Sequence, residues 1–308
     1  MVPWLMKAAA VAVFSKVPHG DKLAAFARRR ITGSLAFPKR MAAGKCDRAR
    51  LHVQHFLDHA GLARVPEGFV ALELGTGWFP IAPVCVALMG ADRVYTVDVT
   101  SHLEWPQLAR TLSVAREIAL AGDVPGIGTE RVGLLDVALS TRNVDAALDT
   151  LGIERVIGDA STIALDRPVD LFFSNNTLEH IPNEALLRIA ERFHALGSER
   201  AVMSHWIDMS DHYAAFDRRI GPFNFLKYPS AVFSYMNGSL HYQNRLRHSD
   251  YQAIHRAAGW RLVVDEPTRG EATDLRALDL APEFSKYAED DLLVYEAWMV
   301  SAKGESPR

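Results

Sequence analysis

Cysteine is scarce in this chain: only Cys46 and Cys85 occur among its 308 residues. The two lie far apart in the sequence, and Cys85 falls inside an apolar helical stretch, so we expect two reduced thiols rather than a disulfide. A small fold stabilised mainly by disulfides is excluded, and a reducing, cytoplasmic compartment is indicated.

The chain also lacks an apolar run long enough to cross a bilayer. Met1–Phe14 is apolar except for Lys7, but it is shorter than a membrane span and no convincing cleavage signal follows it. The whole chain has a net charge of only −3, yet residues 1–50 hold eleven Lys and Arg against two Asp, a local charge of +9. Residues 1–30 therefore predict either a helical lid over an active site, with Trp4 among its packing residues, or peripheral contact with an anionic membrane surface.

Repeats and low-complexity tracts are absent, and short apolar segments alternate with amphipathic ones, as in a doubly wound α/β sheet. Strands are expected at 69–75, 93–98, 154–158, 169–174, 200–206, 260–265 and 292–302. Helices are expected at 47–61, 79–89, 103–121, 183–196 and 248–258, with an extra helical segment at 123–152. The predicted organisation is an N-terminal helical extension or lid (1–65), a catalytic domain (66–303) with an insert at 209–247, and a tail (304–308).

A glycine turn follows the first expected strand. Ala71–Leu74 is apolar apart from Glu73 and leads into Gly75 and Gly77, whose missing side chains let the backbone approach a ligand closely. The next strand ends in Asp98, where a carboxylate can accept both hydroxyls of a ribose. This pattern predicts a nucleotide-type cofactor site.

The third glycine of a dinucleotide fingerprint is missing, because Pro80 occupies its position. Glu73 adds a carboxylate beside the turn, which would repel a pyrophosphate but suits a cationic, methionine-type group. These two residues disfavour NAD and favour S-adenosyl-L-methionine.

Four motifs in this order resemble those of a known enzyme family. They are Glu73–Gly77, Asp98, Gly158-Asp159-Ala160 and Asn175-Asn176-Thr177-Leu178-Glu179-His180. Over about residues 66 to 303 the chain resembles the class I S-adenosylmethionine-dependent methyltransferases, of the bacterial small-molecule type. The resemblance implies a Rossmann-like, mostly parallel seven-stranded sheet whose last strand is antiparallel. It also implies that Glu73, Gly75 and Gly77 meet the methionine end, Asp98 the ribose and Asp159 the adenine amino group. Trp78-Phe79-Pro80 departs from the family pattern and predicts a more closed, partly aromatic wall.

The fourth expected strand ends in Asn175 and Asn176, and open α/β sheets bind ligands at such carboxyl ends. Asn175 is assigned to the cofactor, and Asn176 and His180 to the substrate. In the resembled family the histidine of such a Leu-Glu-His stretch is more often architectural than a base.

Histidines and carboxylates gather after the fifth expected strand, in Ser204–Tyr213. His205 is the first candidate for a general base, with Asp208 or Asp211 orienting it and His212 beside them. Two alternatives stay open: these side chains bind a divalent metal ion, although no metal is assigned, or the aspartates cap a helix near Ser210.

The insert after this cluster is rich in aromatic and basic residues. Arg245 and Arg247 are candidates to clamp a substrate carboxylate or phosphate. Aromatic side chains are candidates for an apolar wall, namely Phe223, Phe225, Tyr228, Phe233, Tyr235 and Tyr242. The competing interpretation is a helical subdomain with a small core of its own.

The sequence thus predicts an S-adenosyl-L-methionine-dependent methyltransferase that acts on a small or lipid-like acceptor, most simply at oxygen. No basic nucleic-acid module is recognisable, and residues 175–178 lack the Asn-Pro-Pro-aromatic motif of enzymes that methylate nucleic-acid amino groups, so DNA and RNA are disfavoured. The rival interpretations are a non-catalytic ligand-binding or membrane-associated module of the same fold and, less favoured, an NAD-dependent oxidoreductase.

Overall fold

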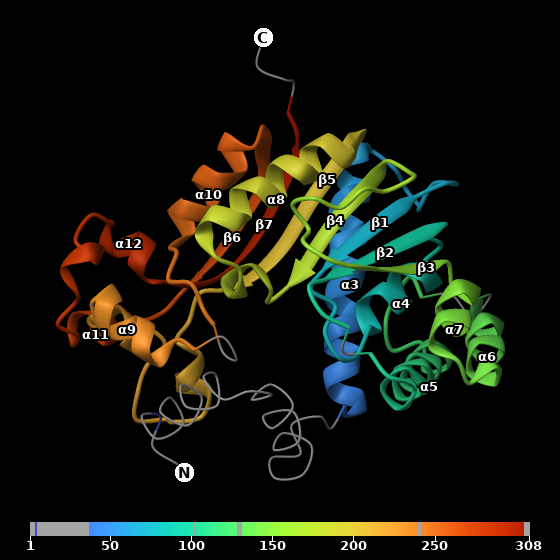
Figure 1. Ribbon diagram of the computed structural model, residues 1–308, viewed down its shortest axis with the longest axis horizontal. Helices are drawn as coiled ribbons and strands as arrows, with labels where there is room; N and C mark the ends of the chain where they lie inside the picture. Colours follow the sequence, from blue (N-terminus) through green and yellow to red (C-terminus); the bar gives the residue numbers. More distant parts are fainter. Residues whose placement is uncertain (1–3, 5–36, 102, 128–130, 239–241, 305–308) are drawn as a thin grey trace.

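One seven-stranded sheet organises the molecule (Figure 1). The computed structural model describes residues 4, 37–101, 103–127, 131–238 and 242–304. The strands lie in the order β3-β2-β1-β4-β5-β7-β6. Their bounds are β1 (Val70–Leu74), β2 (Arg93–Asp98), β3 (Ile153–Ile157), β4 (Val169–Asn175), β5 (Gly197–Asp208), β6 (Trp260–Arg269) and β7 (Val294–Lys303). β7 runs antiparallel to both of its neighbours, β5 and β6, whereas all other pairs are parallel. The expected mostly parallel sheet with an antiparallel last strand is therefore confirmed.

Helices cover both faces of the sheet (Figure 1). One face carries α3 (Lys39–Ala60), α4 (Ile81–Leu88) and α5 (Trp105–Ala121), and the other carries α8 (Asn183–Leu196) and α10 (His248–Ala257). The expected extra helical segment forms α6 (Val132–Thr141) and α7 (Val144–Thr150), and the short helices beyond the sheet are α9 (Ser230–Met236), α11 (Ala272–Arg276) and α12 (Glu289–Leu292).

The central strands are apolar because both of their faces are covered. All five residues of β1 are buried, and they alternate between the two layers: Ala71 packs toward α3 and α4, whereas Leu72 packs toward α8. This alternation decides which side chains of the neighbouring strands reach each layer, including the histidines described below.

The two cysteines correct one expectation. Cys46 on α3 and Cys85 on α4 lie face to face in the same core, with their Cα atoms 5.8 Å apart, and they are joined as a disulfide. The expectation of two reduced thiols was wrong because sequence separation says nothing about which helix faces pack together. The inference of a reducing compartment loses its basis with it.

The insert after β5 has its own small core, built with the chain between β6 and β7. Phe223, Phe225 and Phe233 are buried there together with Leu275 and Phe284. The interpretation of these phenylalanines as an open apolar wall was therefore wrong, and the competing interpretation of a subdomain core is confirmed.

The lid and membrane-contact interpretations fall on residues 1–30, which lie outside the described residues except for Trp4. The Trp4 ring packs against Tyr213 and Tyr228, and its backbone N–H donates to Asp217 Oδ2 at 3.0 Å. No helix among the described residues combines the length and the apolar character needed to span a membrane.

Candidate active site

The glycine turn after β1 meets the end of β2. Gly75 has φ +78° and donates its N–H to Val97 O at 2.8 Å; Gly77 has φ +66° and donates its N–H to Asp98 Oδ2 at 3.1 Å. A side chain at Gly75 would collide with Thr177 in the segment after β4, whereas a Cβ at Gly77 would point into open space. Both glycines therefore have a conformational reason to be glycine, and the turn and Asp98 form one unit.

A pocket opens at the carboxyl ends of β1 and β2. Its lining includes Thr76, Gly77, Pro80, Asp98 and Arg155. Beside it, the Gly158 N–H donates to Asp98 O at 3.0 Å, which brings the segment after β3 against the same edge. The next residue, Asp159, is exposed, and hydrogen bonds from the Ser161 backbone and hydroxyl lower the pKa of its carboxyl group. The three motifs predicted to bind a nucleoside therefore lie at one edge of the sheet.

Glu73 is a buried acid at the end of β1. It is 5% exposed, and its Oε2 has no hydrogen-bond partner among the described residues. Burial raises the pKa of Glu73 to about 7, although the Lys45 ammonium acts in the opposite direction. An unpartnered buried carboxylate oxygen suits a cationic ligand.

Asn175 and Asn176 end β4 with opposite environments. Asn175 Oδ1 lies 3.3 Å from Nε2 of His52, a buried histidine on α3 whose Nδ1 lies 2.7 Å from the Ser204 hydroxyl. Asn176 is exposed, adopts the left-handed φ of +49°, and donates its N–H to Trp206 O at 2.9 Å. Sequence reasoning missed His52, because only packing against β4 and β5 distinguishes it from other helical histidines.

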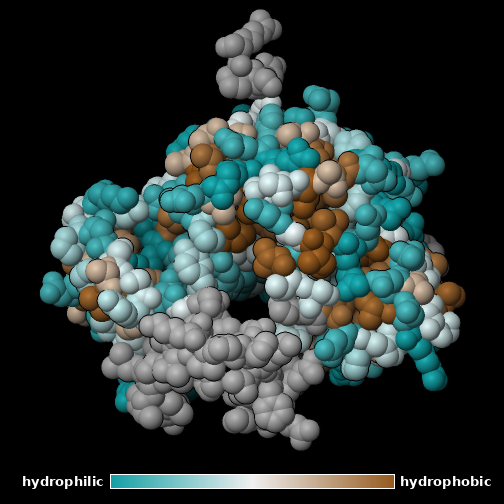
Figure 2. All heavy atoms as spheres, viewed as in Figure 1, coloured by the Kyte–Doolittle hydropathy of each residue, from teal (hydrophilic) through white to brown (hydrophobic). Residues whose placement is uncertain are grey.

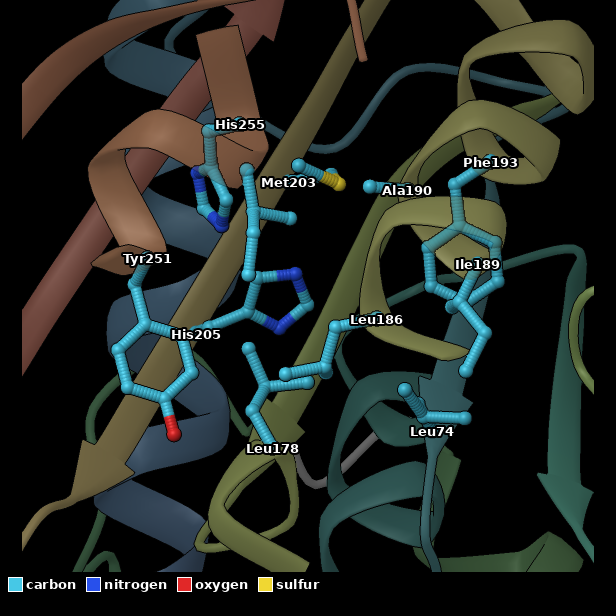
Figure 3. A pocket seen from close by; sticks show the side chains of 11 residues that line it. Leu74, Leu178, Leu186, Ile189, Ala190, Phe193, Met203, His205, Tyr251 and His255 are labelled. Carbon is cyan, nitrogen blue, oxygen red and sulfur yellow. The ribbon is translucent and has the colours of Figure 1, made fainter. Parts of the chain in front are cut away.

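The environment of His205 does not support its predicted role as a general base. His205 is 2% exposed, its Nδ1 lies 2.8 Å from the Ser174 hydroxyl, and burial lowers its pKa well below the usual value. Figure 3 shows its ring projecting from β5 among Leu178, Met203 and His255 in a small, mainly apolar cavity beneath α8 and α10. Neither predicted orienting acid hydrogen-bonds to it among the described contacts, since the alternation of β5 turns His205 into the core.

Asp211 has the capping role that was one of the alternatives. Its carboxylate accepts from Tyr213 N at 2.8 Å and from Asn224 Nδ2 at 2.9 Å. Asp208 instead accepts from the backbone and hydroxyl of Ser210, and its Oδ2 lies 3.6 Å from His212 Nε2. The structure thus joins Asp208 to His212 and separates both from His205.

His212 lies close to His180 and to Glu179, and Glu179 was not predicted as a site residue. The His212 ring is 5.0 Å from that of His180, and His180 Nε2 lies 4.0 Å from Oε1 of Glu179, which is buried. The sequence contained a signal, since Glu179 is adjacent to His180, but its burial depends on packing against β5, which the sequence does not show.

The two arginines hold the insert together. Arg247 is fully buried, and its guanidinium donates to Met209 O at 3.0 Å and to Val294 O at 3.5 Å. Arg245 donates to Glu283 Oε1 at 2.7 Å and stacks over Phe233. Because these guanidinium groups donate to acceptors within the protein, the geometry does not support the expectation that they bind a substrate anion.

No family model matches the chain, and no curated protein matches its sequence. Among solved structures it is similar to an S-adenosylmethionine-dependent methyltransferase from Clostridium acetobutylicum (10% identity, TM-score 0.45, covering 92% of this chain and 99% of that one). It is also similar to one from Methanosarcina mazei (11%, 0.45, covering 78% and 94%) and to magnesium protoporphyrin IX methyltransferase from Synechocystis (11%, 0.42, covering 84% and 84%). At these identities and TM-scores the similarity says nothing about function, which has to be inferred from the chain's own residues.

Proposed function

We propose that this chain is an S-adenosyl-L-methionine-dependent methyltransferase. The observation that carries the proposal is the junction of the glycine turn with Asp98, where the Gly77 N–H donates to the carboxylate at the rim of a pocket. This junction lies at the carboxyl edge of a parallel sheet, which is where open α/β sheets bind nucleotides.

The residues at this edge fit the cofactor. Asp98 would accept the ribose hydroxyls, and Asp159 would accept from the adenine amino group. Glu73, buried with an unpartnered oxygen, would neutralise the cationic methionine end beside the Gly75 backbone. Asn175 would contribute an uncharged amide. Bound S-adenosyl-L-methionine supplies a methyl group already activated by its sulfonium, so the chain's own part is to orient the reactants and exclude water.

The acceptor in this proposal is a small or lipid-like molecule that is methylated at oxygen. In Figure 2 the surface is hollowed between the insert and the part of the sheet where the strands end. Asn176 and His180 follow β4 at that edge and are exposed, so they are available to an acceptor. Peripheral membrane contact through residues 1–30 remains part of the proposal for a lipid-like acceptor.

Calorimetric titration of the full chain tests the cofactor. We expect S-adenosylhomocysteine to bind and NADH not to bind. Asp98→Ala should weaken binding by tens to hundreds of fold, about 2–4 kcal/mol for two hydrogen bonds to a charged acceptor, with the melting temperature retained. Asp136→Ala, at an exposed position on α6, is the matched control and should bind like the wild type. Unchanged affinity in Asp98→Ala would refute the cofactor assignment.

A second measurement concerns Glu73. Because the donor is cationic, the ionised carboxylate should bind it better, and wild-type affinity for S-adenosyl-L-methionine should rise as pH increases through about 7. Glu73→Gln should show no such rise. Formation of S-adenosylhomocysteine with hydroxylated acceptors separates an enzyme from a non-catalytic module, which would bind the donor without turnover.

A further inference from the structure

Three chemistry-bearing side chains converge at the carboxyl ends of β4 and β5. Glu179 and His180 belong to a short 3-10 helix after β4, Leu178–His180, and His212 begins a 3-10 helix after β5, His212–Ala215. Each offers one ligand atom, and these atoms all lie within 4.8 Å of one another. The pocket at the ends of β1 and β2 involves none of them.

Glu179 has an unexplained carboxylate. The residue is 1% exposed, and neither Oε1 nor Oε2 has a side-chain hydrogen-bond partner among the described residues; the groups that face the carboxylate are the backbone N–H groups of Glu179 itself and of Asp208. Its nearest ion-pair partner is His180 Nε2, at 4.0 Å. A buried carboxylate without a close cationic partner is costly, and a metal ion would supply that partner.

The two histidines are prepared as ligands. The Tyr242 carbonyl oxygen can only accept, so His180 Nδ1, 2.7 Å away, donates to it, and Nε2, on the side of Glu179, is the ring nitrogen left for a metal ion. Asp208 Oδ2, 3.6 Å from His212 Nε2, lies where an acid can orient a ligating ring.

The turn that carries Glu179 is held in place. Asn244 donates its backbone N–H to Glu179 O at 2.7 Å, and its side-chain amide donates to Leu178 O and Ile181 O, both at 2.9 Å. Asn244 is itself buried and accepts from the Tyr251 hydroxyl at 3.0 Å. The backbone of the cluster is therefore fixed by α10 and the segment before it, which favours a preformed site.

We propose that Glu179, His180 and His212 form a binding site for a divalent transition-metal ion of the Zn²⁺ type, with Asp208 as a positioning residue. Two imidazoles and one carboxylate suit Zn²⁺, Fe²⁺ or Co²⁺, whereas Mg²⁺ and Ca²⁺ prefer oxygen ligands throughout. Three protein ligands leave at least one coordination position for an oxygen of a bound molecule. That this molecule is the methyl acceptor rests on the proposed function, but metal binding itself does not.

Cobalt titration of the untagged full chain, stripped with a chelator and kept free of S-adenosyl-L-methionine, tests the site. We expect one Co²⁺ per chain, visible by its d–d absorption and displaced by Zn²⁺. His180→Ala and His212→Ala should weaken binding by more than about 100-fold, and Asp208→Asn by about 10–100-fold, as for outer-shell partners of a metal ligand. His59→Ala, an exposed histidine on α3, keeps the histidine count of these variants and should bind like the wild type.

Glu179→Gln is a variant that should still fold, because glutamine has the shape of glutamate but lacks the buried charge. It should stay folded by circular dichroism and still lose Co²⁺ binding. Absence of stoichiometric binding to the wild type, or equal binding in His180→Ala, His212→Ala and Glu179→Gln, would overturn the proposal. Because no donor is present in the titration, that failure would leave the methyltransferase proposal standing, and failure of S-adenosylhomocysteine to bind would leave the metal site standing.

Discussion

Five histidines among the described residues form two groups that differ in their partners. Three interior histidines each bond a serine hydroxyl: His52 to Ser204, His205 to Ser174 and His255 to Ser301, at 2.7–2.8 Å. The two histidines at the strand ends, His180 and His212, lie beside the carboxylates of Glu179 and Asp208.

This difference separates structural from chemical roles. A buried histidine bonded to a neutral hydroxyl stays uncharged and satisfies a polar group of the core. A histidine beside a carboxylate at the carboxyl edge of the sheet can bind a cation or exchange a proton. Four variants test this contrast, and the effect expected on the free energy of unfolding decreases from the first to the last.

The interior group should make the fold sensitive to acid. Burial lowers the pKa of His255 to about 4, so its contribution to stability is present above the unfolded value of 6.5 and is lost as pH falls toward 4. Between these two pH values the free energy of unfolding should fall by up to about 1.4 kcal/mol per pH unit because of His255. In urea unfolding, the wild type should lose about 2 kcal/mol relative to His255→Gln between pH 6.5 and 4.5. A constant difference between the two proteins would contradict a neutral, buried His255.

His205→Gln should lower the free energy of unfolding by about 1–2 kcal/mol, because the Ser174 hydroxyl loses a well-placed partner in the core. Affinity for S-adenosylhomocysteine and turnover per folded molecule should stay close to wild type, since His205 lies beneath α8 and α10 in the cavity of Figure 3. Chemical denaturation and steady-state rates check the two parts. A rate that falls about 100-fold without loss of stability would restore His205 as a base.

Glu179→Gln should raise the free energy of unfolding, whereas His205→Gln lowers it. The folded protein disfavours the ionised carboxylate, so the stability associated with Glu179 is present below the unfolded pKa of 4.5 and is lost as pH rises through the raised folded value. In chelator-treated protein, the Gln variant should therefore be more stable than the wild type at pH 8, by about 1 kcal/mol, and the gain should shrink toward pH 4.5. Denaturation at the two pH values measures it, and a less stable variant at pH 8 would show that Glu179 has a partner.

His180→Gln is the control with the smallest effect. Its side chain is 42% exposed, so the free energy of unfolding should change by less than about 0.5 kcal/mol. A loss as large as that of His205→Gln would abolish the distinction between the two groups of histidines.

Local patterns in the sequence determined most of the fold. Buried apolar strands and amphipathic helices have different periods, so the seven strands and most of the main helices were predicted close to their observed bounds. The exception is α3, expected at 47–61, which already begins at Lys39. Gly75 and Gly77 were also predictable as a turn, because glycine adopts a positive φ without the steric cost that a side chain brings, and Asp98 was predictable because it ends the next strand.

Only the tertiary structure decided what depends on contacts between distant segments. The disulfide of Cys46 with Cys85 follows from the packing of α3 on α4, and the burial of Arg247 follows from the chain around Met209 and Val294. The division of the histidines has the same origin: the twofold alternation of β5 sends His205 into the core, whereas Glu179, His180 and His212 meet because parallel strands bring their carboxyl ends to one edge. A sequence records which residues are present along each strand, but proximity across strands is a property of the folded sheet.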